Sequence, residues 1–236
     1  MIASQHLYII LILACAFLSV IGKKLTLNAA ITGSIIACLI FIGGGQMSLY
    51  LLVAFFILGT AATAWKIDKK AQIEFDANSN GPRKAGQVFA NAGAAGVLGA
   101  LALVFPDSRS LFQLMIAATF ASATSDTLSS ELGNVYGRKF YNILSFKNDQ
   151  KGLNGVISLE GTLFGIAGSF LIAFIFASFN GFSANFYWIA LAGIIGNISD
   201  SILGASLEKK QLINNDAVNL LNTIMASAFI WIVYSI

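Results

Sequence analysis

The chain has 236 residues, of which 57% are hydrophobic and only 11% are charged. Soluble globular domains carry about 25% charged residues, so this composition excludes an ordinary soluble domain and predicts an integral membrane protein. The formal net charge of +3 is explained by the basic loops described below and does not indicate nucleic-acid binding.

Apolar windows follow one another along the chain and predict an all-α fold, a polytopic bundle of about eight membrane helices in a single integral-membrane domain, residues 1–236. Several windows are shorter than the ~20 residues that cross a bilayer comfortably. We therefore expect polar flanks such as Ser125–Glu131 to continue the helices, and seven spans is the alternative count. The windows are Leu7–Ile21, Leu25–Ile42, Leu49–Ala64, Gln87–Phe105, Leu111–Ala123, Ile157–Phe179, Phe186–Ile202 and Ala217–Ile236.

The basic residues support eight spans. Of the 14 Lys and Arg residues, all except Arg109 fall in alternate connections between the windows. The positive-inside rule then places those connections in the cytoplasm and both termini outside, in a multi-pass protein of the cell membrane whose active site faces the cytoplasm. Seven spans would break the alternation. The four basic connections contain Lys23 and Lys24; Lys66, Lys69, Lys70, Arg83 and Lys84; Arg138, Lys139, Lys147 and Lys151; and Lys209 and Lys210.

A polar stretch with several glycines, Asn78–Gly93, opens the fourth window. Glycine lets backbone amides approach a phosphate, arginine binds it with a planar fork, and a helix N-terminus adds a favourable dipole. The alternative is a flexible loop with ordinary positive-inside charges, which we favour for Lys66, Lys69 and Lys70. Phosphate binding is favoured for Arg83, which lies between glycines just before a polar helix start. The candidate phosphate ligands here are Arg83, Lys84, Gln87 and Asn91.

Five carboxylates lie inside the apolar windows or at their rims. A carboxylate near the bilayer costs roughly 2.5–3.5 kcal/mol, so it usually faces a cavity, a partner or a metal. Asp126 shares one helix face with Thr119 and Ser122. Packing against a neighbouring helix would explain these hydroxyls but not an ionised Asp126. The five are Asp126, Glu131, Glu160, Asp200 and Asp216.

The last window opens with a carboxylate among amides, Asp216 beside Asn215 and Asn219. A helix N-cap explains one asparagine at the helix start, but not Asn219 one turn further in. Carboxylates together with amide oxygens suit Mg²⁺, which typically takes one or two carboxylates plus substrate phosphates. We therefore expect Mg²⁺ as cofactor, with Asp126 and Asp216 as its ligands.

A weak internal repeat links two parts of the chain. Ser125–Leu128 ends one window and Ser199–Ile202 ends another two windows later, and each is followed by a basic loop and a window that opens with an acid. Such hairpins would be parallel repeats. Chance is the alternative for so short a match.

One sequence of motifs resembles the CTP-using polyprenol kinases. In dolichol and phytol kinases, an Asp at a helix end, a Gly-x-x-x-Gly-Arg/Lys turn and a Lys-Ser-x-Glu-Gly-Thr/Ser string recur in that order. The chain has Asp126–Gly133, then Gly137-Arg138, then Ser158–Thr162, with Ile157 in place of the Lys and Lys147 or Lys151 as its candidate substitute. The resemblance implies nucleotide or phosphate binding by Ser130, Glu131, Gly133, Arg138, Lys151, Ser158 and Thr162.

A closer resemblance covers nearly the whole chain. Arg83–Asn91, Ser125–Gly133, Asp200–Ala205 and Asn215–Asn219 look like the integral-membrane family that includes transmembrane protein 19 and plant phytyl-phosphate kinase. The resemblance implies transfer of a phosphoryl group from CTP to an isoprenyl monophosphate, giving the diphosphate. It also implies a nucleotide and a prenyl-phosphate lipid as partners. The catalytic candidates are Asp126, Glu160, Asp200 and Asp216, with Asn215 and Asn219 among the phosphate-binding residues.

Two other functions compete with a lipid kinase. A secondary transporter of a small ion or anionic metabolite could also use polar strings beside small-residue helices. Transport should place polar groups at mid-bilayer and on both faces, whereas the outer connections are nearly featureless. A purely structural protein would not need five rim carboxylates. The nucleotide, the prenyl chain, kinase against cytidylyltransferase chemistry and the oligomeric state stay open.

Overall fold

The computed structural model describes residues 2–70 and 81–235, so Asn78–Asn80 of the polar stretch lie outside the described residues. Within these ranges the chain forms eight long α-helices and one short one, which confirms the all-α class and the count of eight. The helices are α1 (Ile2–Ile21), α2 (Leu27–Leu39), α3 (Gly45–Ala64), α4 (Ile67–Lys70), α5 (Ala85–Val104), α6 (Arg109–Tyr136), α7 (Leu159–Asn180), α8 (Ala184–Leu203) and α9 (Asn215–Ser235).

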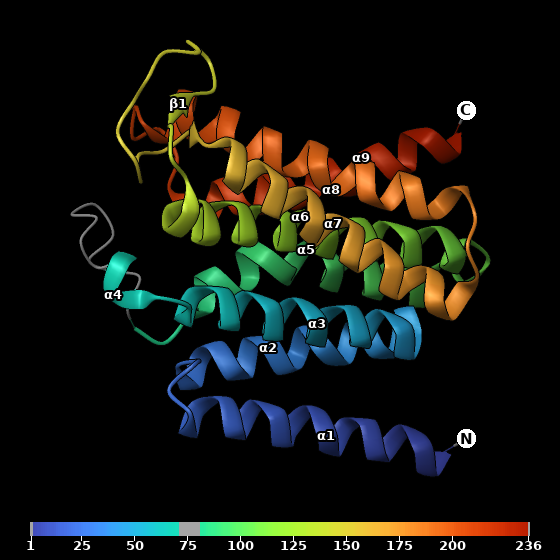
Figure 1. Ribbon diagram of the computed structural model, residues 1–236. Coiled ribbons are helices and arrows are strands. Elements are labelled where there is room, and N and C mark those ends of the chain that lie inside the picture. The colour runs from blue at the N-terminus through green and yellow to red at the C-terminus, as the bar shows by residue number, and fades with distance from the viewer. Residues whose placement is uncertain (1, 71–80, 236) are drawn as a thin grey trace.

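The long helices lie side by side and run alternately in opposite directions, so that both chain termini lie at the same end of the bundle (Figure 1). The connections that carry the predicted alternate groups of Lys and Arg gather at the other end, together with α4. We call this the basic end, and the end with the two termini the opposite end. The arrangement agrees with the alternation of charge along the sequence.

Five helical runs are long and apolar enough to cross a membrane. The first, Leu27–Ala64, makes two passes, because a π-helical turn η1 (Ile40–Gly44) and Gly45, with a φ of +84°, reverse the chain between α2 and α3. The apolar part of α1 is shorter, and α6 is long but more polar. The other four runs are Ala85–Val104, Leu159–Asn180, Ala184–Glu208 and Asn215–Ser235.

Helix α6 is the centre of the bundle. Every residue from Ile116 to Ser125 is buried, and the helix packs against α3, α5, α7, α8 and α9. A helix that is buried on all sides belongs to the interior. The hydroxyls of Thr119 and Ser122 therefore never meet lipid, which explains how α6 tolerates a polar composition. The helix continues to Tyr136, as expected from the polar flank Ser125–Glu131.

Side-chain caps set the starts of two helices at the basic end. The Ser158 hydroxyl accepts the backbone N–H of Gly161 at 3.1 Å and begins α7. Asn214 Oδ1 accepts the N–H of Ala217 at 2.9 Å at the start of α9. Such caps satisfy the free N–H groups of a first helical turn. Asn215 and Asn219 are therefore not needed as caps.

The connections of the basic end contain more structure than the sequence predicts. Between α6 and α7, strands β1 (Tyr141–Asn142) and β2 (Val156–Ile157) pair antiparallel. After α8 the chain continues as a π-helical turn η3 (Gly204–Glu208), so the helical part reaches Glu208 and not only the window's end at Ile202. A 3₁₀ turn η2 (Pro106–Ser108) links α5 to α6 at the opposite end.

Close packing of α5 against the end of α2 depends on Gly99. A Cβ added at Gly99 would stand 2.6 Å from the carbonyl oxygen of Leu39 and 2.8 Å from its carbon. We expect Gly99→Ala to lower the free energy of unfolding by about 1–3 kcal/mol, the usual cost of overpacking. Thermal unfolding of the purified protein in detergent measures the change.

Gly33→Ala, on α2, is the matched control. Its added Cβ would lie 3.6 Å from Val88, an ordinary contact, so stability should stay unchanged or rise slightly because alanine favours helices. Equal unfolding temperatures for the two variants would contradict the close contact at Gly99.

Candidate functional site

Two carboxylates meet inside the basic end of the bundle. Asp126 on α6 and Asp200 on α8 lie within hydrogen-bonding reach of each other. Asn222 on α9 donates its Nδ2 to Asp200 Oδ1 at 2.7 Å, and Ser122 on α6 donates to Asn222 Oδ1 at 3.1 Å. The pair is therefore held by three helices, and its members are the two aspartates of the predicted repeat.

This carboxylate pair has no basic partner among residues 2–70 and 81–235, since the ion pairs of these ranges all involve other acids. Two carboxylates in contact either share a proton, so that only one is ionised, or are both ionised with a cation between them. The donor set of Asp126 and Asp200 therefore fits a divalent cation bound by one or two carboxylates. Within the described part of the chain, three or more Asp, Glu, His or Cys side chains do not gather at one point.

Glu208, a residue that the sequence did not single out, lies close enough to Asp126 and Asp200 to act on both electrostatically. It ends the π-helical turn η3 and lies near Asn154 of the α6–α7 connection. Glu208 follows Asp200 by eight residues, so the two would share one face of a continuous helix. The sequence would have indicated Glu208 if the helix had been expected to continue past Ile202.

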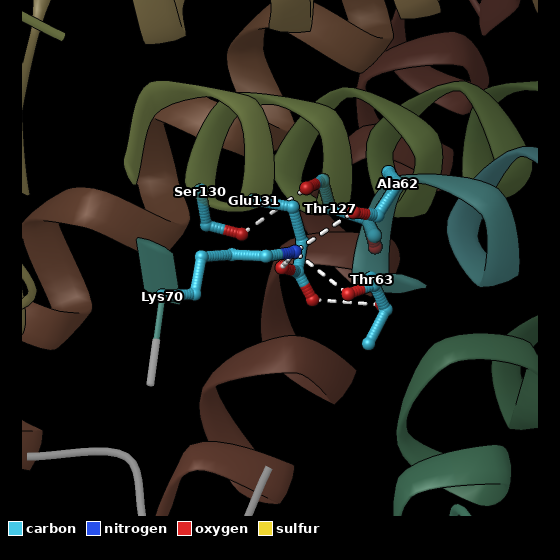
Figure 2. A network of polar contacts seen from close by, with 6 residues as sticks. All are labelled: Ala62, Thr63, Lys70, Thr127, Ser130 and Glu131. Atoms are coloured by element: carbon cyan, nitrogen blue, oxygen red, sulfur yellow. Dashed lines mark hydrogen bonds and ion pairs between the residues drawn. The ribbon is translucent and has the colours of Figure 1, made fainter. Parts of the chain in front are cut away.

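A second network joins three helices around Glu131 (Figure 2). Lys70 at the end of α4 reaches Glu131 on α6 with an Nζ–Oε2 distance of 2.6 Å, and Thr63 of α3 donates to Glu131 Oε1 at 2.7 Å. Lys70 also donates to the carbonyl oxygens of Ala62 and Thr63 at 2.8 and 2.7 Å. Lys70 therefore neutralises Glu131 and caps the carboxyl end of α3, and our interpretation of Lys70 as a free loop charge was wrong.

Arg83 points into the bundle from the loop before α5. A Cβ added at Gly59 of α3 would stand 3.0 Å from Arg83 Nη2 and 3.6 Å from the Thr127 methyl group, so the guanidinium lies between α3 and α6. It also lies over the ring of Phe55, 5.9 Å from the ring centre. A larger residue than glycine at position 59 would push this side chain aside.

The backbone of Arg83 is fixed by the α1–α2 connection. Its N–H donates to Lys24 O at 2.9 Å, and its carbonyl accepts the N–H of Thr26 at 3.1 Å. Burial lowers the pKa of the Arg83 guanidinium from its ordinary value, and the negative charge of Glu131 opposes that shift. Arginine stays charged at neutral pH. A partly buried guanidinium with no carboxylate within 4.0 Å in the described ranges favours an anionic ligand.

Asp216 lies against the first turn of α5. A Cβ added at Gly86 would clash with its Oδ2 and lie 3.5 Å from its Cγ. The pairing of Asp126 with Asp216 around Mg²⁺ stays a prediction, and the carboxylate that the structure brings into contact with Asp126 is Asp200. At the same helix start, Gln87 Oε1 accepts the N–H of Lys84 at 2.8 Å, and Asn91 Nδ2 donates to Gln87 O at 2.9 Å.

Glu160 lies at the rim of the basic end. Its Oε1 is 3.8 Å from Arg138 Nε, and its Oε2 accepts the Arg138 N–H at 3.4 Å. The rest of the kinase-like string has local roles: Gly133 faces Gly161 across the α6–α7 contact, and Thr162 donates to Ser158 O at 3.0 Å.

The remaining candidates lie near the surface of the same end. Ser130 donates to Thr127 O at 3.2 Å on its own helix. Lys84, Ser130 and Asn215 are exposed, whereas Lys151 and Asn219 are partly buried. The structure thus brings Asp126 and Asp200 into contact, and it places the other candidates around them at the basic end without a direct contact to this pair.

The comparison with protein families gives a match to the integral membrane proteins described as DUF92, over residues 10–227. The chain belongs to this family. Among similar proteins, an uncharacterized membrane protein of Methanocaldococcus jannaschii is 33% identical over 232 residues, which cover 97% of this chain and 94% of that protein.

Two plant proteins are also similar to this DUF92 chain. The chloroplastic protein VTE6 of Arabidopsis thaliana is 33% identical over 190 residues, which cover 78% of this chain and 57% of VTE6. Protein PGR of the same plant is 30% identical over 217 residues, covering 82% of this chain and 75% of PGR. No solved structure matches the chain significantly.

The Lys70–Glu131 pair of this DUF92 protein gives a test of the network in Figure 2. We expect Lys70→Met to lower the free energy of unfolding by about 1–3 kcal/mol, because a half-buried carboxylate loses its cation. Glu131→Gln in the same chain should recover most of this loss, since no charge is then left unpaired. Thermal unfolding in detergent measures both changes.

Lys69→Met is the control, since Lys69 is exposed and adjacent in the sequence. If Lys70→Met and Lys69→Met unfolded at the same temperature, the ion pair would have no part in stability.

Proposed function

We propose that this DUF92 protein is a nucleotide-dependent lipid kinase that phosphorylates an isoprenyl monophosphate to the diphosphate, with CTP as the expected nucleotide. The observation that carries the proposal is the contact of Asp126 with Asp200 inside the basic end, together with the partly buried Arg83 at the same end of the bundle. The membership of the DUF92 family and the resemblance to phytyl-phosphate kinase agree with it.

Phosphoryl transfer needs little covalent chemistry from a protein, because positioning and charge stabilisation supply most of the catalysis. The oxygen of the prenyl phosphate attacks the terminal phosphorus of the nucleoside triphosphate. A new P–O–P bond forms and the bond to the nucleoside diphosphate breaks, so the products are prenyl diphosphate and nucleoside diphosphate. The acceptor oxygen is already ionised near neutral pH, so a strong general base is not required.

Arg83 is the residue that we assign to phosphate. Its fork of donors suits the two oxygens of a phosphate group, and its position between Gly59 and Thr127 places it against α6 at the basic end. Lys84 and Arg138 add positive charge near the rim of the same end. The exposed position of both suits the first encounter with an anionic substrate.

Asp126 and Asp200 would hold Mg²⁺, and Asn222 keeps Asp200 in place through its 2.7 Å hydrogen bond. Mg²⁺ bound there would neutralise charge on the nucleotide phosphates during transfer. Asp216 of α9, which lies against the first turn of α5, and Glu208 near the pair add negative charge that favours a cation in this region. Glu160 stays a proposed catalytic residue at the rim, where it orients the prenyl phosphate together with Arg138.

The placement of the basic end in the cytoplasm is part of the proposal. It rests on the alternation of Lys and Arg, which the positive-inside rule assigns to the cytoplasmic side. A soluble nucleotide would then reach the bundle from the cytosol, and the prenyl chain would stay in the bilayer. The head group of the lipid meets the nucleotide at the depth of Asp126.

The direct test is purified protein with labelled CTP, Mg²⁺ and prenyl monophosphates of different chain lengths. We expect labelled prenyl diphosphate and CDP in equal amounts, and no product without Mg²⁺. Absence of product with CTP, ATP, GTP and UTP alike would overturn the kinase proposal and leave transport of an anion as the alternative. Formation of pyrophosphate in place of CDP would indicate a cytidylyltransferase.

Asp126→Asn keeps the size of the side chain and removes its charge. Turnover should fall by at least ~100-fold if the lost contact to Mg²⁺ contributes about 2.7 kcal/mol to the transition state. Thermal stability should stay the same or increase, because one of two adjacent carboxylates is gone. The assay with labelled CTP and an unfolding curve give the two readouts.

Asp107→Asn is the matched control, since Asp107 is exposed at the opposite end in η2. It should retain full turnover. Wild-type turnover in Asp126→Asn would remove Asp126 from the site even if the kinase activity itself is confirmed.

A further inference from the structure

Arg109 is the one basic residue that breaks the charge alternation of the chain. Membrane proteins tend to keep Lys and Arg out of short connections on the non-cytoplasmic side. The presence of an arginine in such a position therefore suggests a specific interaction of its side chain. In the structure Arg109 begins α6 at the opposite end, far along that helix from Asp126.

A cavity of about 310 Å³ lies at this arginine. It is formed by α1, the π-helical turn η1, the start of α3 and the start of α6. Its volume is at the lower end of the ~300–1,000 Å³ that small-molecule sites usually have. Arg109 and two glutamines supply the polar part of the wall. The lining residues are Gln5, Ile9, Phe41, Ile42, Gly45, Gln46 and Arg109.

The main-chain turn beside the cavity is fixed by side chains of α6. Gln113 Nε2 donates to Gly44 O at 2.7 Å, and Arg109 Nη2 lies 3.4 Å from Ile42 O. The carbonyl of Ile42 uses one of the five N–H donors of Arg109. Among the described residues no carboxylate lies within 4.0 Å of Arg109. Most of its hydrogen-bonding capacity is therefore left for a ligand.

The cavity is divided into a charged part and an apolar part. Arg109 is the first residue of α6, so its charge lies at the level where the helices end. Ile9 lies one turn further into α1 than Gln5, and a helical turn rises about 5.4 Å. The wall thus changes from cationic and amide groups to aliphatic groups toward the middle of the bundle. This order matches an amphiphile with an anionic head.

We propose that this cavity binds an anionic phospholipid of the surrounding bilayer, with the lipid phosphate on Arg109 and an acyl chain along Ile9 and Ile42. A guanidinium binds phosphate oxygens in pairs, which a single ammonium cannot do. The lining contains no Asp or Glu that could pair with the ammonium of a zwitterionic head group. The site is independent of the proposed phosphoryl transfer, which belongs to the basic end.

Lipid binding can be measured by native mass spectrometry of the purified protein with phosphatidylglycerol, phosphatidylcholine or soluble glycerol phosphate. We expect phosphatidylglycerol to bind at least about 10-fold more tightly than phosphatidylcholine, and glycerol phosphate not to bind. Arg109→Gln should weaken phosphatidylglycerol binding about 10-fold, and Arg109→Lys by less. Ile9→Trp, which fills the apolar part and keeps the arginine, should weaken it as well.

Lys210→Gln is the matched control, because it removes one exposed charge at the basic end and should leave lipid binding unchanged. Unchanged phosphatidylglycerol binding in Arg109→Gln and Ile9→Trp would overturn the proposal. Equal binding of phosphatidylcholine would also overturn it. Binding of glycerol phosphate as tight as that of the lipid would show a plain anion site instead.

Discussion

The enclosure of α6 is the constraint on which the rest of the structure depends. A helix with Thr119, Ser122 and Asp126 on its surface cannot face hydrocarbon, because each unpaired polar group there costs several kcal/mol. Five helices surround α6 and exclude lipid from it. Glycines such as Gly165 on α7 and Gly196 on α8 stand where a side chain would collide with α6, so these neighbours can come close. Small residues commonly serve this purpose in membrane bundles.

The charges of the basic end are organised around this helix. Glu131 is matched by Lys70 and Thr63 on one side of α6, and Asp126 meets Asp200 on another. One carboxylate is therefore already neutralised by the protein, and the other pair still needs a proton or a cation. This difference separates a structural acid from a site for a ligand. It explains why two acids five residues apart on one helix have different roles in the proposed function.

The sequence alone was sufficient for the helices and their directions, because hydropathy and the placement of Lys and Arg are local properties. It was also sufficient to select Asp126, Asp200 and Arg83 as unusual. It could not select the partner of Asp126, since the polar strings around Asp200 and Asp216 look equally suitable and only the rotation of α8 and α9 decides. Glu208 was not singled out because a π-helical turn extends α8 to it, and the pairing of Lys70 with Glu131 was missed because the short helix α4 positions Lys70. Neither the π-helical turn nor the four-residue helix α4 was expected from the hydropathy windows.

The central position of α6 also has a consequence for biosynthesis. The chain is made from its N-terminus, so α6 leaves the ribosome before α7, α8 and α9, three of the helices that enclose it. Until they arrive, Asp126 has neither Asp200 nor Asn222 beside it, and an isolated carboxylate is poorly soluble in lipid. The full enclosure of α6 is therefore possible only after α7, α8 and α9 have been translated. The stable place of the central helix is created by helices that are synthesised after it.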